Sequence, residues 1–319
     1  MTATWVLAAV GGALLVVGPR LRHLSWLEGS PRLGIALWQA LCVSAVAVPV
    51  LIGLTVVVPA TAWVGGLAAL MHACVQSMQQ AYGFHGDALE PTLGLLLAGA
   101  VLVWVSGWIA FDLHRARRER TRMRRSLAAV SSPDFDLGAR VLDSPTAAAF
   151  CVPGRDSQVV VTAGALAALS AAEVAGVLAH ERAHLRARHH LAVAGTRSLS
   201  RAFPGISLFA VASEQVTRLV ELAADDRAAH EVDRVTVASA IVRLAAMRAP
   251  RSALAMADCA TPGVTASRVG RLLAPVDPLP PRRLGGVLAT LVGVLGTPVA
   301  VAMAPAISTA ITHLCTGVS

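Results

Sequence analysis

Four long apolar runs constrain this chain most strongly, because a stretch of about 20 apolar residues is long enough to cross the hydrocarbon core of a bilayer. The runs cover residues 3–19, 33–58, 93–111 and 284–307. With 55% hydrophobic and 14% charged residues, the chain is also too apolar for an ordinary soluble domain. The sequence therefore predicts an α-helical polytopic membrane protein with four transmembrane helices. Arg20 and Arg22 follow the first run instead of preceding it, so we expect an uncleaved anchor.

Arginine sets the expected orientation, because the chain has no lysine and all 27 of its basic residues are Arg. They fall within residues 20–32 and 115–283, and basic residues next to spans stay on the cytoplasmic side. We therefore expect a bacterial cytoplasmic-membrane protein with both termini and the 59–92 loop outside and residues 112–283 in the cytosol. The run RARRERTRMRR at 115–125 adjoins a span, which favours a stripe on anionic lipid headgroups over nucleic-acid binding.

This threading divides the chain into residues 1–111 with three spans, residues 112–283 as a cytosolic domain, and residues 284–319 with the fourth span and a short outward tail. The cytosolic domain is predicted to be mainly helical, of α+β class. A helix begins at Ser170, where Glu173 completes a capping box. The other expected pieces are strands at 147–152 and 158–162, helices at 206–230 and 233–248, and a buried or membrane-surface segment at 203–212.

The stretch AHERAH places two histidines four residues apart on a helix, so both imidazoles project from one face and can share one zinc ion. These are His180 and His184, and Glu181 between them is placed to act as the general base for a zinc-bound water. A catalytic zinc needs a third protein ligand, for which the later helix offers Glu221. Asp225, one turn further on, is placed to accept a hydrogen bond from a ligating histidine. The sequence thus predicts one Zn²⁺ per chain.

The alternative is a solvated, charged helix face, because H-E-x-x-H is a short pattern that also occurs by chance. The capped helix start and the Glu-x-x-x-Asp pair favour the zinc site. His189 and His190 are expected at the surface. His230 and Arg218 remain candidates for oxyanion or substrate contacts, against the simpler interpretation of exposed helix residues.

The five cysteines show no metal-type spacing. Cys42, Cys151 and Cys259 are expected to be inert packing residues. Cys74 and Cys315 are both expected on the outer side, where a disulfide is stable, but the sequence does not show whether they meet.

The passage SPTAAAFCVPGRDSQVVVTAGALAALSAAEVAGVLAHERAHLRARHH, followed by ELAADDRAA, resembles the BlaR/MecR-type membrane metallopeptidases, an antirepressor family with the gluzincin pattern. The resemblance implies that His180, His184 and Glu221 bind zinc, that Glu181 is the general base and that Asp225 holds a histidine. Three spans before the protease domain and one after it separate this chain from the related HtpX and CAAX-protease group.

The resemblance also implies that the AAAFCV piece, with Ala148 and Phe150, is an edge strand that binds an extended substrate. At Ala148, relatives often carry a polar residue that helps to hold the substrate backbone. Antibiotic-sensing members have a penicillin-binding domain after the last span, whereas only a handful of residues follow it here. Without lysine there is no Ser-x-x-Lys acylation site, so we expect no covalent β-lactam sensing by this chain.

The function that the resemblance implies is cleavage of a cytosolic winged-helix repressor in signal transduction and transcription regulation. An HtpX-like quality-control protease for membrane proteins and a non-catalytic signalling scaffold are the alternatives. Expected partners are the protein substrate and membrane lipids, without direct nucleic-acid contact. A separate sensor protein docking on the outward loop remains an open expectation, as does a homo-oligomer.

Overall fold

The computed structural model describes residues 2–24, 26–57, 89–248, 260–274 and 280–316. The outward loop predicted at 59–92 falls almost wholly outside this range, as do Cys74 and Cys259. The side chain of Cys315 is likewise not described. Predictions that concern these residues therefore stay predictions.

Within the described residues, four helices are long and apolar enough to cross a membrane, and each covers one of the four predicted spans. Their large apolar side chains are turned outward, among them Trp5, Val103 and Val292, each more than 70% exposed. So much exposed apolar surface requires a lipid environment. The four helices are α1 (Thr2–Val17), α3 (Pro31–Val57), α6 (Leu89–Val130) and α13 (Pro281–Thr316), with the short η1 (Gly18–His23) and α2 (Trp26–Gly29) between the first two.

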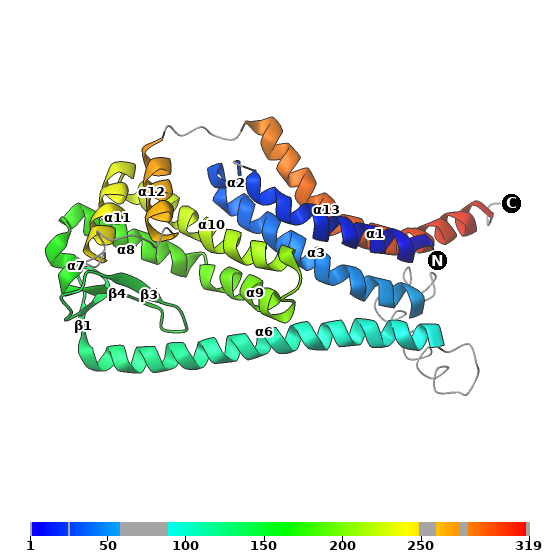
Figure 1. The fold of residues 1–319 in the computed structure, drawn as a ribbon, viewed down its shortest axis with the longest axis horizontal. Helices are drawn as coiled ribbons and strands as arrows, with labels where there is room; N and C mark the ends of the chain where they lie inside the picture. Colours follow the sequence, from blue (N-terminus) through cyan, green and yellow to red (C-terminus); the bar gives the residue numbers. More distant parts are fainter. Residues whose placement is uncertain (1, 25, 58–88, 249–259, 275–279, 317–319) are drawn as a thin grey trace.

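Helix α6 is one rod of 42 residues, about 63 Å at the usual helical rise, and it runs along the whole molecule (Figure 1). The arginine run 115–125 continues this helix, because no glycine or proline interrupts residues 108–130. The run therefore lies on the same helix as the third predicted span, and its contact with anionic headgroups stays a prediction.

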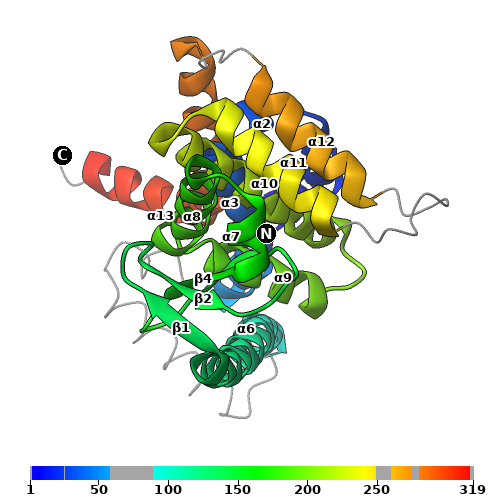
Figure 2. The same ribbon diagram turned by 90° about the vertical axis from the view of Figure 1, so that its left-hand side faces the viewer.

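A small four-stranded sheet lies at the far end of α6 (Figure 2). Its strands are β1 (Ser131–Asp134), β2 (Ala139–Leu142), β3 (Ala149–Val152) and β4 (Gln158–Thr162), in the order β1-β2-β4-β3. The structure confirms both predicted strands and leaves β3 at an edge. β1 and β2 were not predicted, because SSPD and ARVL lack the length and alternation of a strand signal.

The remaining helices cover the sheet and connect it to the spans. They are α7 (Ala163–Ala168), α8 (Ala171–Arg186), α9 (His189–Ala202), α10 (Ser207–Glu231), α11 (Arg234–Arg248) and α12 (Ala260–Leu273). The predicted capping box at the start of α8 is present: the Ser170 hydroxyl accepts from the Glu173 amide, and the Glu173 carboxylate accepts from the Ser170 amide. Ser239 and Arg243 of α11 also bind the Glu173 carboxylate, so the start of α8 is held from two sides.

The largest core is shared between the spans and the domain that carries α8 and α10. Leu37, Trp38 and Leu41 of α3 pack in one buried cluster with Leu208 and Phe209 of α10. The predicted apolar piece 203–212 is thus the turn before α10 together with the first residues of this helix, of which Leu208, Phe209 and Ala212 are buried. The domain is built onto α3, which fixes α10 relative to the membrane helices.

Gly53→Val is expected to destabilise the crossing of α3 and α6, because a Cβ at Gly53 collides with the carbonyl oxygen of Gly94 and lies 3.0 Å from the Cβ of Ala98. Overpacking of this kind typically costs about 1–3 kcal/mol. Thermal unfolding in detergent measures the loss. Gly99→Val is the matched control, since a Cβ there meets nothing within 4 Å. Equal losses in both variants would show that helix propensity, not the crossing, is responsible.

Candidate active site

Two packed helices, α8 and α10, bring three metal-ligating side chains together. The Nε2 atoms of His180 and His184 lie 3.1 Å apart. Nε2 of His180 is 3.6 Å and Nε2 of His184 is 3.5 Å from a carboxylate oxygen of Glu221. Helical spacing accounts for this convergence, because residues four apart on α8 face the same side of the neighbouring helix.

These distances fit a tetrahedral metal ion. Metal–ligand bonds of about 2.0–2.1 Å at tetrahedral angles place ligand atoms about 3.4 Å apart, close to the three separations that this group shows. Two imidazoles and one carboxylate are the donor set of catalytic zinc, which keeps a fourth position open. The Glu221 side chain is 36% exposed, so the group is open on one side.

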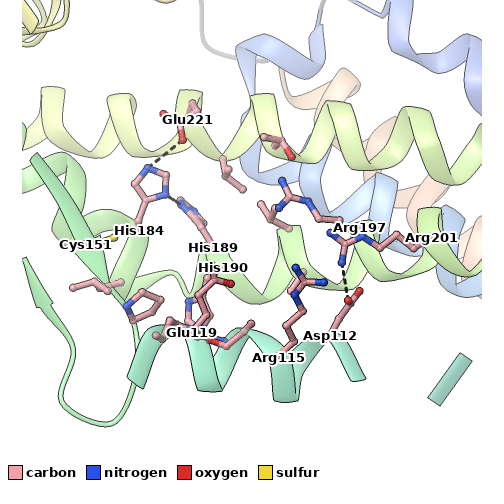
Figure 3. A pocket seen from close by; sticks show the side chains of 18 residues that line it. Asp112, Arg115, Glu119, Cys151, His184, His189, His190, Arg197, Arg201 and Glu221 are labelled. Atoms are coloured by element: carbon pink, nitrogen blue, oxygen red, sulfur yellow. Dashed lines mark hydrogen bonds and ion pairs between the residues drawn. The ribbon is translucent and has the colours of Figure 1, made fainter. Parts of the chain in front are cut away.

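The outer nitrogen of each histidine is also held. Nδ1 of His180 lies 2.9 Å from the carboxylate of Asp225, which is fully buried. Nδ1 of His184 lies 3.0 Å from Nδ1 of His189 (Figure 3). Fixing Nδ1 aims Nε2 at the metal position. The prediction that His189 is a surface residue is wrong: the short turn between α8 and α9 folds it back, leaving it 7% exposed.

Arg268 of α12 completes the surroundings of the ligands. Its guanidinium binds both carboxylate oxygens of Asp225, at 2.8 and 2.7 Å, and lies 3.3 Å from Glu221. A buried carboxylate needs such compensation, because leaving its charge unpaired is costly. Nothing in the local sequence pointed to Arg268, because it lies 43 residues after Asp225 and α12 carries no motif.

The two ligand histidines differ in their proton affinity. Burial opposes the charge on His180, but hydrogen bonds to Asp225 and Glu221 outweigh it and raise its pKa to about 9. Burial and the neighbouring His180 lower the pKa of His184 to about 4. Burial alone would raise the pKa of Glu221, yet His180 and Arg268 hold it below its usual range. At neutral pH the additional proton of the metal-free histidine pair therefore lies on His180.

Zinc affinity is expected to fall as the pH drops below about 9, because His180 must lose its proton before its Nε2 can bind metal. One released proton corresponds to about a tenfold change in affinity per pH unit. Chelator competition between about pH 6.5 and 8.5 measures the slope. Asp225→Asn removes the carboxylate that stabilises the proton on His180, so the zinc affinity of this variant should depend less on pH. An affinity that does not change over this range would contradict the assignment.

Glu181 faces the edge strand of the sheet. Burial, followed by the charge of Glu181 and a hydrogen bond to its carboxylate, raises the pKa of the Cys151 thiol to about 12. At neutral pH the thiol is therefore protonated. Cys151 was predicted as an inert packing residue, and its place beside Glu181 emerges only when β3 packs on α8.

The edge strand β3 has main-chain N–H and C=O groups that are free to pair with a substrate. These groups do not belong to Ala148 and Phe150, the two residues that were predicted to bind it. The Ala148 carbonyl accepts from the Thr162 amide at 3.0 Å, and the Ala148 amide donates to the Thr162 hydroxyl at 2.9 Å. Hydrogen-bonded pairs alternate in an antiparallel ladder, so Phe150 also turns its backbone groups toward β4. The outward N–H and C=O groups belong to Ala149 and Cys151, where a substrate strand can pair.

The two remaining candidates do not join the site. The Arg218 guanidinium pairs with the carboxylate of Glu28 on α2 at 2.8 Å. The sequence could not indicate this partner, because Glu28 and Arg218 are far apart along the chain. His230 is exposed at the end of α10, about 13 Å along the helix from Glu221. Arg268, and not Arg218, lies beside Glu221 and Asp225.

Comparison with known proteins agrees with this geometry. Residues 114–260 match the model of peptidase family M48, and this span contains α8, α10 and the whole His180–His184–Glu221 group. The curated proteins and the solved structures compared with the chain include no match. The resemblance to BlaR/MecR-type proteins therefore rests on the residues quoted above. This match, together with the four helices that are long and apolar enough to cross a membrane, supports a zinc metallopeptidase of membrane type.

Proposed function

We propose that this chain is a gluzincin-type zinc endopeptidase whose active site lies on the cytosolic side of the membrane. The observation that carries the proposal is the convergence of His180, His184 and Glu221 between α8 and α10, with Glu181 next to the first ligand. A structural zinc site would close all four positions with protein ligands. The open side of this group favours catalysis over a scaffold.

Zinc, when bound, polarises the scissile carbonyl and activates a water molecule. Glu181 takes the proton of that water and later delivers it to the leaving amine. Asp225 keeps His180 in orientation, and Arg268 holds Asp225 in turn. The free main-chain groups of β3 align the substrate as an added strand.

The substrate that the BlaR/MecR resemblance favours is a cytosolic winged-helix repressor, cleaved in signal transduction. Quality control of membrane proteins is the second candidate, and one observation favours it. The indole of Trp104, within the apolar part of α6, donates to the Ala202 carbonyl at the end of α9. From this contact α9 runs back about 20 Å along its axis to His189, so a single helix connects the apolar part of α6 to the active site, which favours membrane-anchored substrates.

Purified protein in detergent, supplied with zinc, tests the proposal on both substrate classes. Cleavage of a repressor that stops on adding a zinc chelator supports the signalling role. Cleavage confined to unfolded membrane proteins supports quality control. If the protein binds one zinc ion per chain but cuts none of these substrates, the non-catalytic signalling scaffold is the alternative that remains.

The predicted threading places Arg155 and Arg234 in the cytosol and Asp87 and Ser319 outside, the last two beyond the described residues. Single cysteines introduced at these positions are expected to react with a membrane-impermeant thiol reagent in intact cells only at 87 and 319. Permeabilised cells are the control for accessibility. Labelling at 155 in intact cells would reverse the orientation and exclude a cytosolic substrate.

The outward loop is proposed as a receiver for a separate sensor protein. Replacing residues 62–85 with a Gly/Ser linker of equal length tests this role. Unchanged induction of target genes would remove the loop as receiver. Lost induction with protease activity retained in detergent would support it.

A further inference from the structure

A cleft of about 500 Å³ runs between α6 and α9, from the metal-ligating group toward the membrane helices. His184 and Glu221 line one end, and Asp112 and Arg201 line the other (Figure 3). Cys151 of the edge strand also lines it, followed by Pro153. A ligand in this cleft therefore reaches both the edge strand and the metal position.

The membrane end of the cleft is cationic. Apart from the metal-ligating group, the cleft is lined by four arginines and only two carboxylates. The arginines are Arg115, Arg120, Arg197 and Arg201, and the carboxylates belong to Asp112 and Glu119. Arg201 is neutralised by Asp112 at 2.7 Å. In the described part of the chain, neither Arg115 nor Arg197 has an acidic partner. Arg115 points from α6 toward α9 (Figure 3), and Arg197 of α9 also lines the cleft.

A buried polar atom in the cleft wall is also unpaired. Nδ1 of His190 has no hydrogen-bond partner in the described structure, although it is shielded from the surface. Buried polar groups are rarely left unsatisfied, and exceptions mark positions where a ligand or ordered water binds.

The walls of the cleft are fixed at both ends. At the membrane end, Asp112 accepts from Ser198 at 2.8 Å and pairs with Arg201. At the far end, Leu127 of α6 is buried against Val152 and Val160 of the sheet. The cleft is thus a preorganised site, which lowers the cost of ordering the groups that bind a ligand.

We propose that this cleft binds acidic side chains of the substrate on the N-terminal side of the scissile bond, an inference that rests on the proposed peptidase function. β3 points its C-terminal end, Cys151 to Pro153, into the cleft. A substrate strand antiparallel to β3 therefore enters the cleft with the residues that precede the cleaved bond. From His189 to Arg197 the α9 axis rises about 12 Å, the length of three or four extended residues.

A peptide fits the cleft better than an anionic lipid does. An anionic lipid headgroup would need only the end of the cleft that is lined by arginines in order to bind. The cavity instead continues to His184 and Glu221, so its occupant is the molecule that is cut. Lipid binding becomes an outcome that the experiment can detect.

The test compares two peptides that differ only in a Glu-Glu or Gln-Gln pair three and four residues before the cleaved bond. The wild-type enzyme is expected to prefer the acidic peptide by about tenfold in kcat/KM, and salt should reduce this preference. Arg115→Gln and Arg197→Gln should each reduce the acidic-to-neutral ratio by about three- to fivefold, the effect of one exposed ion pair. Arg117→Gln, on α6 but outside the cleft, is the matched control and should keep the wild-type ratio.

Binding of the same peptides to zinc-loaded Glu181→Gln separates this inference from the proposed function. Cleavage of both peptides at equal rates would overturn the cleft assignment and leave the peptidase intact. If peptide binding depends on Arg115 and Arg197 but the wild type cleaves neither peptide, the proposed peptidase function is wrong and the assignment of the cleft as a site for acidic side chains is supported. If a variant that combines Arg115→Gln with Arg197→Gln loses only binding to anionic vesicles, the cleft is a lipid site and the proposal is wrong.

Discussion

Glu181→Gln is expected to lower kcat by about 10²- to 10⁴-fold, the usual contribution of a positioned general base. The amide cannot accept the proton of the attacking water, whereas its size and its place on α8 are unchanged. The same variant should bind zinc as well as the wild type does, because Glu181 is not one of the converging ligands. Peptide hydrolysis and metal analysis on one preparation measure both properties.

Glu214→Gln is the matched control for this variant, since Glu214 is exposed on α10 and contacts none of the three ligands. It should retain wild-type activity. A Glu181→Gln enzyme that keeps most of its activity would assign the proton transfer to another group. A variant that loses zinc would show that Glu181 acts by holding the metal site together.

His184→Ala is expected to reduce bound zinc from one ion per chain to nearly none, because two remaining ligands hold a metal weakly. Asp225→Asn should be milder, with about a 10- to 100-fold loss in affinity or activity, since Asp225 orients His180 without touching the metal. Arg268→Gln is expected to fall in the same range, because Arg268 acts through Asp225. Metal analysis after dialysis against a weak chelator ranks the three variants by the amount of zinc that each retains.

Full zinc occupancy in His184→Ala would exclude the site on α8. Circular dichroism should show that each variant stays folded, which separates ligand loss from unfolding. Arg227→Gln is a suitable control, since its pair with Glu231 lies on the surface of α10. It should change neither zinc content nor activity.

Features set by neighbouring residues were predictable from the sequence. The four spans followed from runs of apolar residues, and the start of α8 followed from Ser170 and Glu173 at capping-box spacing. The convergence of His180 and His184 followed from the helical repeat. Each of these depends on contacts within about one turn or on the solvent that surrounds a segment.

Other features depended on how distant segments pack. The sequence could not show that Arg268 binds Asp225, that Glu28 binds Arg218, or that His189 folds back onto His184. The register of β3 against β4, which exposes Ala149 and Cys151, is likewise a pairing between two strands. Ion pairs and strand registers of this kind have no local periodicity.

By itself, the sequence determined four apolar helices long enough to cross a membrane, a helix with two candidate zinc-ligating histidines and a candidate third ligand, because periodicity and hydropathy act locally along the chain. Only the tertiary structure decided that α6 runs beneath the domain and encloses a cationic cleft next to the candidate ligands. The reason is physical: the cleft exists because Asp112 and Leu127, on one rigid helix, are anchored to two different parts of the domain.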